Sequence, residues 1–108
     1  MKLKFLGFTQ SRGTGTNDDT GEKFDFDSVT MDCVTDMSAK GKNLVAQGGQ
    51  HYKKVKFKAC DTKAIFGGLI SDPSELESLC GCYLYVDGVT YSTKTGQYIS
   101  AEEIRPVD

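Results

Sequence analysis

Hydrophobic and polar side chains alternate with a period of two along most of the chain, which is the pattern of half-buried β-strands. The clearest alternating segment is Tyr52–Cys60. Its apolar positions are Val55, Phe57 and Ala59, and its cationic positions are Lys54, Lys56 and Lys58. The same period predicts four further strands, at Lys2–Phe8, Lys23–Val34, Gly81–Thr90 and Tyr98–Val107.

Two stretches interrupt this pattern. Gln10–Gly21 is rich in Gly, Asn and Asp and contains no apolar residue, so we expect a long exposed loop or wing. Residues 35–50 are similarly loop-like, with at most a short strand at Leu44–Ala46.

Within the second predicted strand, the apolar residues switch from one face of the strand to the other. The apolar set shifts from even to odd positions between Phe26 and Val29. We interpret this shift as a β-bulge near residues 27 and 28, which would re-aim Phe24 and Phe26 relative to the rest of the strand.

A short helix is predicted between the third and fourth strands. Asp72 is a suitable N-cap, Pro73 suits the first helical position and Glu75 suits the first turn, so we expect a helix over Pro73–Leu79. The resulting order predicts a single domain, residues 1–108, of the all-β class with one short helix. A five-stranded OB-type Greek-key barrel uses this order. A small sandwich, or an open five-stranded sheet with one helix, would give nearly the same order.

Charge is unevenly distributed along the chain. The formal net charge is −2, which is unusual for a nucleic-acid-binding protein. Residues 1–70 carry eleven Lys and Arg against eight Asp and Glu, whereas residues 71–108 carry two against seven. The chain can therefore present a basic face despite its net charge. We find neither a signal peptide nor a membrane-spanning segment, and we expect a cytoplasmic protein with four reduced thiols.

Candidate catalytic and metal-binding groups are sparse. His51 has no partner at metal-ligand spacing, and strand periodicity places Cys80 and Cys82 on the core face with Leu84. The Gly13-to-Gly15 stretch lacks the lysine of a phosphate-binding loop, and we assign it only loop flexibility. We therefore expect no enzymatic activity, no cofactor and no metal.

The lysine-bearing strand is the most distinctive feature. Its three lysines repeat at roughly 6.6 Å, comparable to the phosphate spacing of an extended single strand. An edge strand protected against aggregation by lysines is an equally good explanation of these residues alone. Aromatic residues that lie near positive charge favour nucleic-acid binding, because flat rings stack on bases. These aromatic residues are Phe24, Phe26, Tyr52, Tyr91 and Tyr98.

Three stretches resemble the single-stranded DNA-binding proteins of filamentous phages, the gene V type and its relatives. Met1–Thr9 resembles their first strand, Thr20–Phe26 their wing strand, and Thr95–Val107 their closing hairpin and strand. Glu22, Glu102 and Glu103 depart from the family by placing acidic residues in these stretches.

The resemblance implies an OB-type barrel that forms a homodimer and coats phage DNA during replication in the host cytoplasm. It also implies that Phe24, Phe26 and Tyr98 contact bases, while Lys23 and Arg105 lie near phosphates.

Taken together, the residues and the resemblance predict binding to single-stranded DNA, or RNA, without strong sequence specificity. The expected nucleic-acid-binding residues are Arg12, Lys23, Phe24, Phe26, Tyr52, Lys54, Lys56, Lys58, Tyr98 and Arg105. The alternative is a small phage or plasmid regulatory domain that binds a host protein through its acidic C-terminal third.

Overall fold

The computed structural model describes residues 1–36, 43, 45, 46 and 48–107. Its elements in chain order are β1 (Lys2–Thr16), β2 (Lys23–Asp36), β3 (Gln50–Lys58), the 3-10 helix η1 (Ala59–Asp61), α1 (Thr62–Ile65), the 3-10 helix η2 (Pro73–Leu79), β4 (Tyr83–Thr93) and β5 (Gly96–Pro106). The prediction of a mostly β protein with a short helical segment and a five-stranded sheet is therefore confirmed. No helix among these residues is long and apolar enough to cross a membrane.

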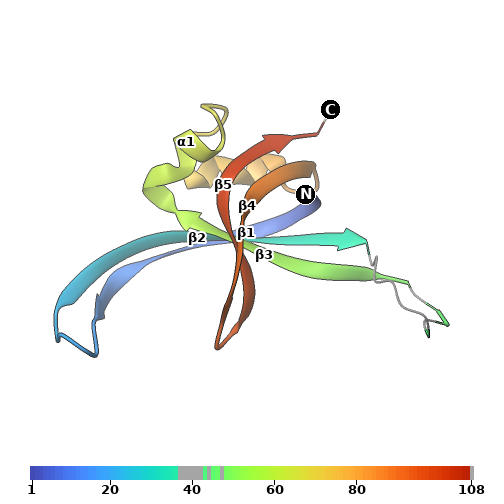
Figure 1. Ribbon diagram of the computed structural model, residues 1–108. Coiled ribbons are helices and arrows are strands. Elements are labelled where there is room, and N and C mark those ends of the chain that lie inside the picture. The colour runs from blue at the N-terminus through green and yellow to red at the C-terminus, as the bar shows by residue number, and fades with distance from the viewer. Residues whose placement is uncertain (37–42, 44, 47, 108) are drawn as a thin grey trace.

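The five strands form one sheet in the order β1-β2-β3-β5-β4, and β4 pairs back with β1, so the sheet closes on itself. All neighbours are antiparallel except β3 and β5, which are parallel. The hairpin of β1 and β2 and the hairpin of β4 and β5 both extend away from the closed part, and the helical segments cover its opposite end (Figure 1).

The core lies inside the closed sheet and is built from inward positions of every strand. The side chains with no exposed surface include Leu3, Phe5, Met31, Val55 and Leu84. The helical connection seals one end of this core: Phe66 meets Phe57 edge to face at 6.0 Å, and Leu76 of η2 is fully buried. Burial of this apolar surface is the main force that holds the strands together.

The predicted helix is present with the predicted bounds, as a 3-10 helix. Asp72 accepts a hydrogen bond from the Ser74 amide at 2.9 Å, and the Glu75 carboxylate accepts one from the Asp72 amide at 3.2 Å. This reciprocal pair is a capping box, which satisfies amides that a helix start leaves without partners.

The predicted loop at Gln10–Gly21 is wrong for most of its length. β1 continues to Thr16 and pairs residue by residue with β2, from Lys4 opposite Val34 to Thr16 opposite Lys23. Only residues 17–22 form the turn, in which the Asn17 side chain accepts a hydrogen bond from the Asp19 amide at 2.9 Å. The predicted wing is thus an ordered two-stranded hairpin.

The bulge predicted near Asp27 and Ser28 is also wrong. These residues pair with Arg12 and Ser11 without a register shift, and the shift lies instead in β1, between Phe5 and Gly7. The parity of the apolar residues changes because Phe24 and Phe26 lie on the outer face, and not because the strand bends.

Two smaller predictions also need correction. Cys80 and Cys82 are exposed, because β4 begins only at Tyr83 and Gly81 interrupts the alternation with a φ of 88°. The short strand expected at Leu44–Ala46 is not formed at Val45 and Ala46, and Leu44 lies outside the described residues.

Candidate nucleic-acid interface

A row of lysines runs along the outer face of β3. Val55 and Phe57 point inward and are 0% and 7% exposed. Strand alternation therefore sends Lys54, Lys56 and Lys58 to the outer face.

Neighbouring strands add polar and aromatic groups to the same face. On β2, Ser28 lies opposite Lys58, and on β5, Tyr98 lies opposite Lys54. On β4, Tyr91 lies opposite Tyr98 and continues the row. The outer face of these four strands thus carries lysines on β3 and tyrosines on β5 and β4.

Tyr98 lies between a cation and a second ring. The Lys56 ammonium lies 4.7 Å from the centre of the Tyr98 ring, and Tyr91 stacks on Tyr98 at 5.7 Å between ring centres and an interplanar angle of 24°. Because β3 and β4 flank β5 on its two sides, Lys56 and Tyr91 approach Tyr98 from opposite sides. Tyr98 is half-buried and Tyr91 is 37% exposed, so Tyr91 presents the outward ring of the pair.

The Tyr98 hydroxyl is also constrained. It shares a hydrogen bond of 2.7 Å with the Thr95 hydroxyl. This hydrogen bond, followed by the charges of Lys56 and Lys54, lowers the pKa of the Tyr98 phenol. Tyr98 is therefore held in place at both its ring and its hydroxyl.

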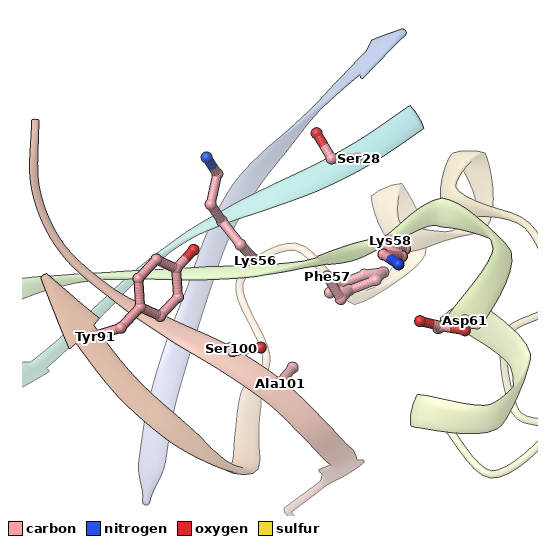
Figure 2. A pocket seen from close by; sticks show the side chains of 8 residues that line it. All are labelled: Ser28, Lys56, Phe57, Lys58, Asp61, Tyr91, Ser100 and Ala101. Atoms are coloured by element: carbon pink, nitrogen blue, oxygen red, sulfur yellow. The ribbon is translucent and has the colours of Figure 1, made fainter. Parts of the chain in front are cut away.

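A hollow opens beside this row of side chains. Figure 2 shows Ser28, Lys56 and Tyr91 around it, contributed by three different strands. The complete lining is Ser28, Lys56, Phe57, Lys58, Asp61, Tyr91, Ser100 and Ala101. The hollow therefore combines two ammonium groups with two aromatic rings and one carboxylate.

The β1–β2 hairpin carries two further rings on the same outer face. Phe24 and Phe26 are 51% and 40% exposed and lie opposite Gly15 and Gly13. A Cβ atom placed on Gly15 would lie 2.5 Å from the Phe24 ring, and one on Gly13 would lie 3.0 Å from the Phe26 ring. Each ring therefore rests directly over a glycine, and only the missing side chain allows this close contact.

Polar contacts hold the register on the opposite face of the hairpin. The Arg12 guanidinium pairs with the Asp27 carboxylate at 3.0 Å, and the Thr14 hydroxyl donates to Asp25 at 2.9 Å. The Gln10 amide donates to Asp27 at 2.8 Å, and this bond is the main reason that the pKa of Asp27 lies below its usual value. The hairpin is thus polar on one face and aromatic on the other.

A second hollow joins the hairpin to the lysine row. It is lined by Phe24, Asp25, Phe26, Asp27, Ser28, Lys58 and Cys60. Ser28 and Lys58 line both hollows. The outer face from Phe24 to Tyr91 is therefore one continuous surface.

The structure brings together most of the residues predicted from the sequence. Lys54, Lys56, Lys58, Phe24, Phe26 and Tyr98 share this surface, and Tyr52 lines a small hollow at its margin with Lys54 and Tyr98. Three of the predicted residues lie elsewhere. Arg12 and Lys23 alternate onto the polar face of the hairpin, and Arg105 lies opposite Tyr85 at the far end of β5.

Sequence reasoning missed the supporting residues Gly13, Gly15 and Ser28, and it named Tyr91 as an aromatic residue near positive charge without including it among the expected binding residues. Propensity alone places the two glycines in a flexible loop, although their spacing matches that of Phe26 and Phe24 across the hairpin. A Gly-x-Gly segment followed by Phe-x-Phe was the available signal. Aromatic rings placed over strand glycines recur in stable sheets.

The possible metal ligands of the described residues are scattered. Within the described ranges, no group of three or more His, Cys, Asp or Glu side chains could hold a metal ion. His51 is exposed near the start of β3.

No protein-family model, no curated protein and no solved structure matches this chain.

Proposed function

We propose that this protein binds single-stranded DNA, or RNA, along the outer face of β2, β3, β5 and β4, without strong sequence specificity. The observation that carries the proposal is the continuity between the aromatic hairpin and the lysine row through Ser28 and Lys58. Cations at regular spacing suit phosphates, and exposed rings suit unpaired bases. This combination is used by proteins that hold single strands without sequence readout.

The fold is consistent with this proposal. We propose that the closed five-stranded sheet is an OB-type Greek-key barrel, on the basis of its order β1-β2-β3-β5-β4 and the helical segments between β3 and β4. Such barrels bind single strands on the outer surface of their sheet. We further propose that the protein resembles the filamentous-phage proteins in forming a homodimer and coating phage or plasmid DNA during replication in the host cytoplasm.

Lys56→Ala tests the phosphate contacts. Each phosphate contact made by a lysine releases counterions, so its loss should flatten the slope of log affinity against log salt by about 0.7 on a single strand. The measurement is fluorescence anisotropy of a labelled oligothymidylate between roughly 50 and 200 mM salt. Lys63→Ala is the matched control, because Lys63 is an exposed lysine on α1, outside both hollows.

Two results would contradict the proposal. One is equal binding of single- and double-stranded DNA, and the other is the absence of binding to either at low salt. The alternative of a regulatory domain that binds a host protein through its acidic C-terminal third would then be preferred. Equal salt slopes for Lys56→Ala and Lys63→Ala would remove the lysine row from the interface.

A further inference from the structure

A second group of tyrosines and cations lies at the other end of β4. On the outer face, Lys2 of β1 lies opposite Tyr85 of β4, and Tyr85 lies opposite Arg105 of β5. The neighbouring positions Leu84 and Val86 are buried, so Tyr83 and Tyr85 alternate outward.

Both tyrosines are exposed and both have a cation over the ring. The Lys2 ammonium lies 5.0 Å from the centre of the Tyr83 ring, and the Arg105 guanidinium lies 5.4 Å from that of Tyr85. Tyr83 is 48% exposed and Tyr85 is 40% exposed. The remaining cation–ring pair in the described part of the chain is Lys56 with Tyr98, in the interface already described.

A hollow adjoins this second group. Its lining consists of Lys2, Val34, Thr35, Gln50 and Tyr83. An aromatic ring can stack on a base, an ammonium can meet a phosphate, and the amide and hydroxyl groups of Gln50 and Thr35 can bond to base edges. These groups together match the chemistry of one nucleotide.

The cations of this group are available for a phosphate. Among the side chains that the structure describes, the single ion pair joins Arg12 to Asp27, so none of their carboxylates lies within ion-pairing distance of Lys2 or Arg105. An acidic row, Asp87 opposite Glu103, lies further along β4 and β5 toward the first interface. The charge of Lys2 therefore favours a phosphate beside it. The carboxylates of Asp87 and Glu103 disfavour a path of the nucleic acid directly along β4.

A different route connects the two surfaces. A small hollow that includes Lys54 and Tyr98 of the first surface is also lined by Met1 and Tyr52. Met1 precedes Lys2 in the chain, and Tyr52 lies two residues after Gln50 on β3. A single-stranded nucleic acid that leaves Tyr98 can therefore pass Tyr52 and reach Lys2 and Tyr83 without crossing the acidic row.

We propose that the hollow beside Lys2 and Tyr83 binds a second nucleotide segment of the same single strand, with Tyr83 stacking on a base and Lys2 meeting a phosphate. This inference rests on the proposed function. The surface of β4 and β1 thus extends the interface beyond the lysine row and increases the number of nucleotides that one protomer covers.

The experiment compares oligothymidylates of increasing length, for example about 6 and about 16 nucleotides, within the range of lengths that such barrels cover. A longer oligonucleotide offers more positions at which a short binding site can be occupied, and this alone raises its apparent affinity. We expect the parent to bind the long oligonucleotide more tightly than this statistical effect explains. Tyr83→Ala should remove roughly 5- to 150-fold of this gain and leave the short-strand affinity within about twofold of the parent.

Conservative variants separate contact from folding. Tyr83→Phe and Lys2→Arg should keep the gain, because each retains the ring or the charge, and Lys63→Ala should keep it as an exposed lysine outside the hollow. Absence of a length-dependent gain in the parent, or an unchanged gain in Tyr83→Ala, would overturn the inference while short-strand binding continues to support the proposed function. Loss of short-strand binding in the parent would instead overturn the proposed function itself.

Thymidine monophosphate distinguishes a strand from a free nucleotide as the occupant. We expect the long oligonucleotide to quench tyrosine fluorescence more than the short one does, and Tyr83→Ala to abolish this additional quenching, whereas the monophosphate should cause no quenching that depends on Tyr83. If the monophosphate quenches the fluorescence at the same concentration and Tyr83→Ala abolishes this quenching, the hollow binds a free nucleotide. This result would overturn the proposal that it binds a segment of the single strand.

Discussion

Replacing Gly15 with alanine tests whether the ring of Phe24 is presented to bases by the glycine beneath it. The added Cβ atom would lie 2.5 Å from the ring, and ordinary contact begins at 3.4 Å, so the ring must move by 3.4 − 2.5, or about 0.9 Å. At Gly13 the corresponding movement of Phe26 is 3.4 − 3.0, or about 0.4 Å. Gly15→Ala should therefore disturb the aromatic face more than Gly13→Ala.

The displaced ring no longer lies flat against the hairpin, so we expect Gly15→Ala to lose much of one base-stacking contact. Such a contact is worth about 1–3 kcal/mol, which corresponds to a roughly 5- to 150-fold weaker affinity for oligothymidylate. The salt dependence should stay the same, because no charge is lost. Stability should change little, because alanine in a strand restricts the unfolded chain and offsets the local crowding.

Two measurements are needed: anisotropy titration for affinity, and the proton NMR shift of the Hα at position 15 for the position of the ring. The parent should show an upfield Hα shift caused by the Phe24 ring current. Gly7→Ala is the control, because Gly7 lies in the same strand, has no atom within 4 Å of an added Cβ and does not have a positive φ. If Gly15→Ala moves the ring but binds oligothymidylate as tightly as Gly7→Ala, the position of the Phe24 ring over Gly15 does not contribute to binding of the nucleic acid.

Three further predictions concern the thiols, the hairpin carboxylate and the assembly. Burial, and then the charge of Asp32, raises the pKa of the Cys33 thiol to about 12, so a thiol reagent at neutral pH should label three cysteines of the folded protein quickly and Cys33 only after denaturation; four equal rates would contradict this. The lowered pKa of Asp27 means that its carboxylate stabilises the fold above the unfolded pKa, near 3.8, and loses this effect as the pH falls through the lower folded pKa. Thermal melts should thus show Asp27→Asn less stable than the parent at pH 7 and indistinguishable from it in strong acid, and a difference that persists in acid would exclude the carboxylate as its cause. Light scattering at micromolar concentration should return a dimer mass, and a monomer mass would remove the proposed homodimer.

Sequence alone predicted those parts of the fold that depend on local alternation. The inward Val55 and Phe57 and the outward lysines of β3 follow from a period of two, which needs no knowledge of neighbouring strands. The cap at Asp72 is likewise local, since its partners lie within three residues. These features were correctly predicted because each depends on only a few adjacent residues.

The errors arose where pairing between distant residues determines the structure. Gly13 and Gly15 favour a loop by propensity, but the facing rings of Phe26 and Phe24 hold them in a strand. The predicted bulge in β2 assumed that every apolar side chain of the strand faces the core. Tyr91 was noticed as aromatic, but its position against Tyr98 depends on the register of β4 with β5, which the sequence does not reveal.

The outer part of the β1–β2 hairpin pairs with no third strand in the described structure, because β3 reaches β2 only from Ser28 onward. A two-stranded ribbon of this kind is marginal by itself, so its backbone amides should open at a lower free energy than those of the closed sheet. A ligand that binds across Phe24 and Phe26 must therefore also order the ribbon that carries them. Part of the binding free energy would be spent on this ordering, and the gain in order would appear as slower amide hydrogen exchange in residues 11–16 and 23–27.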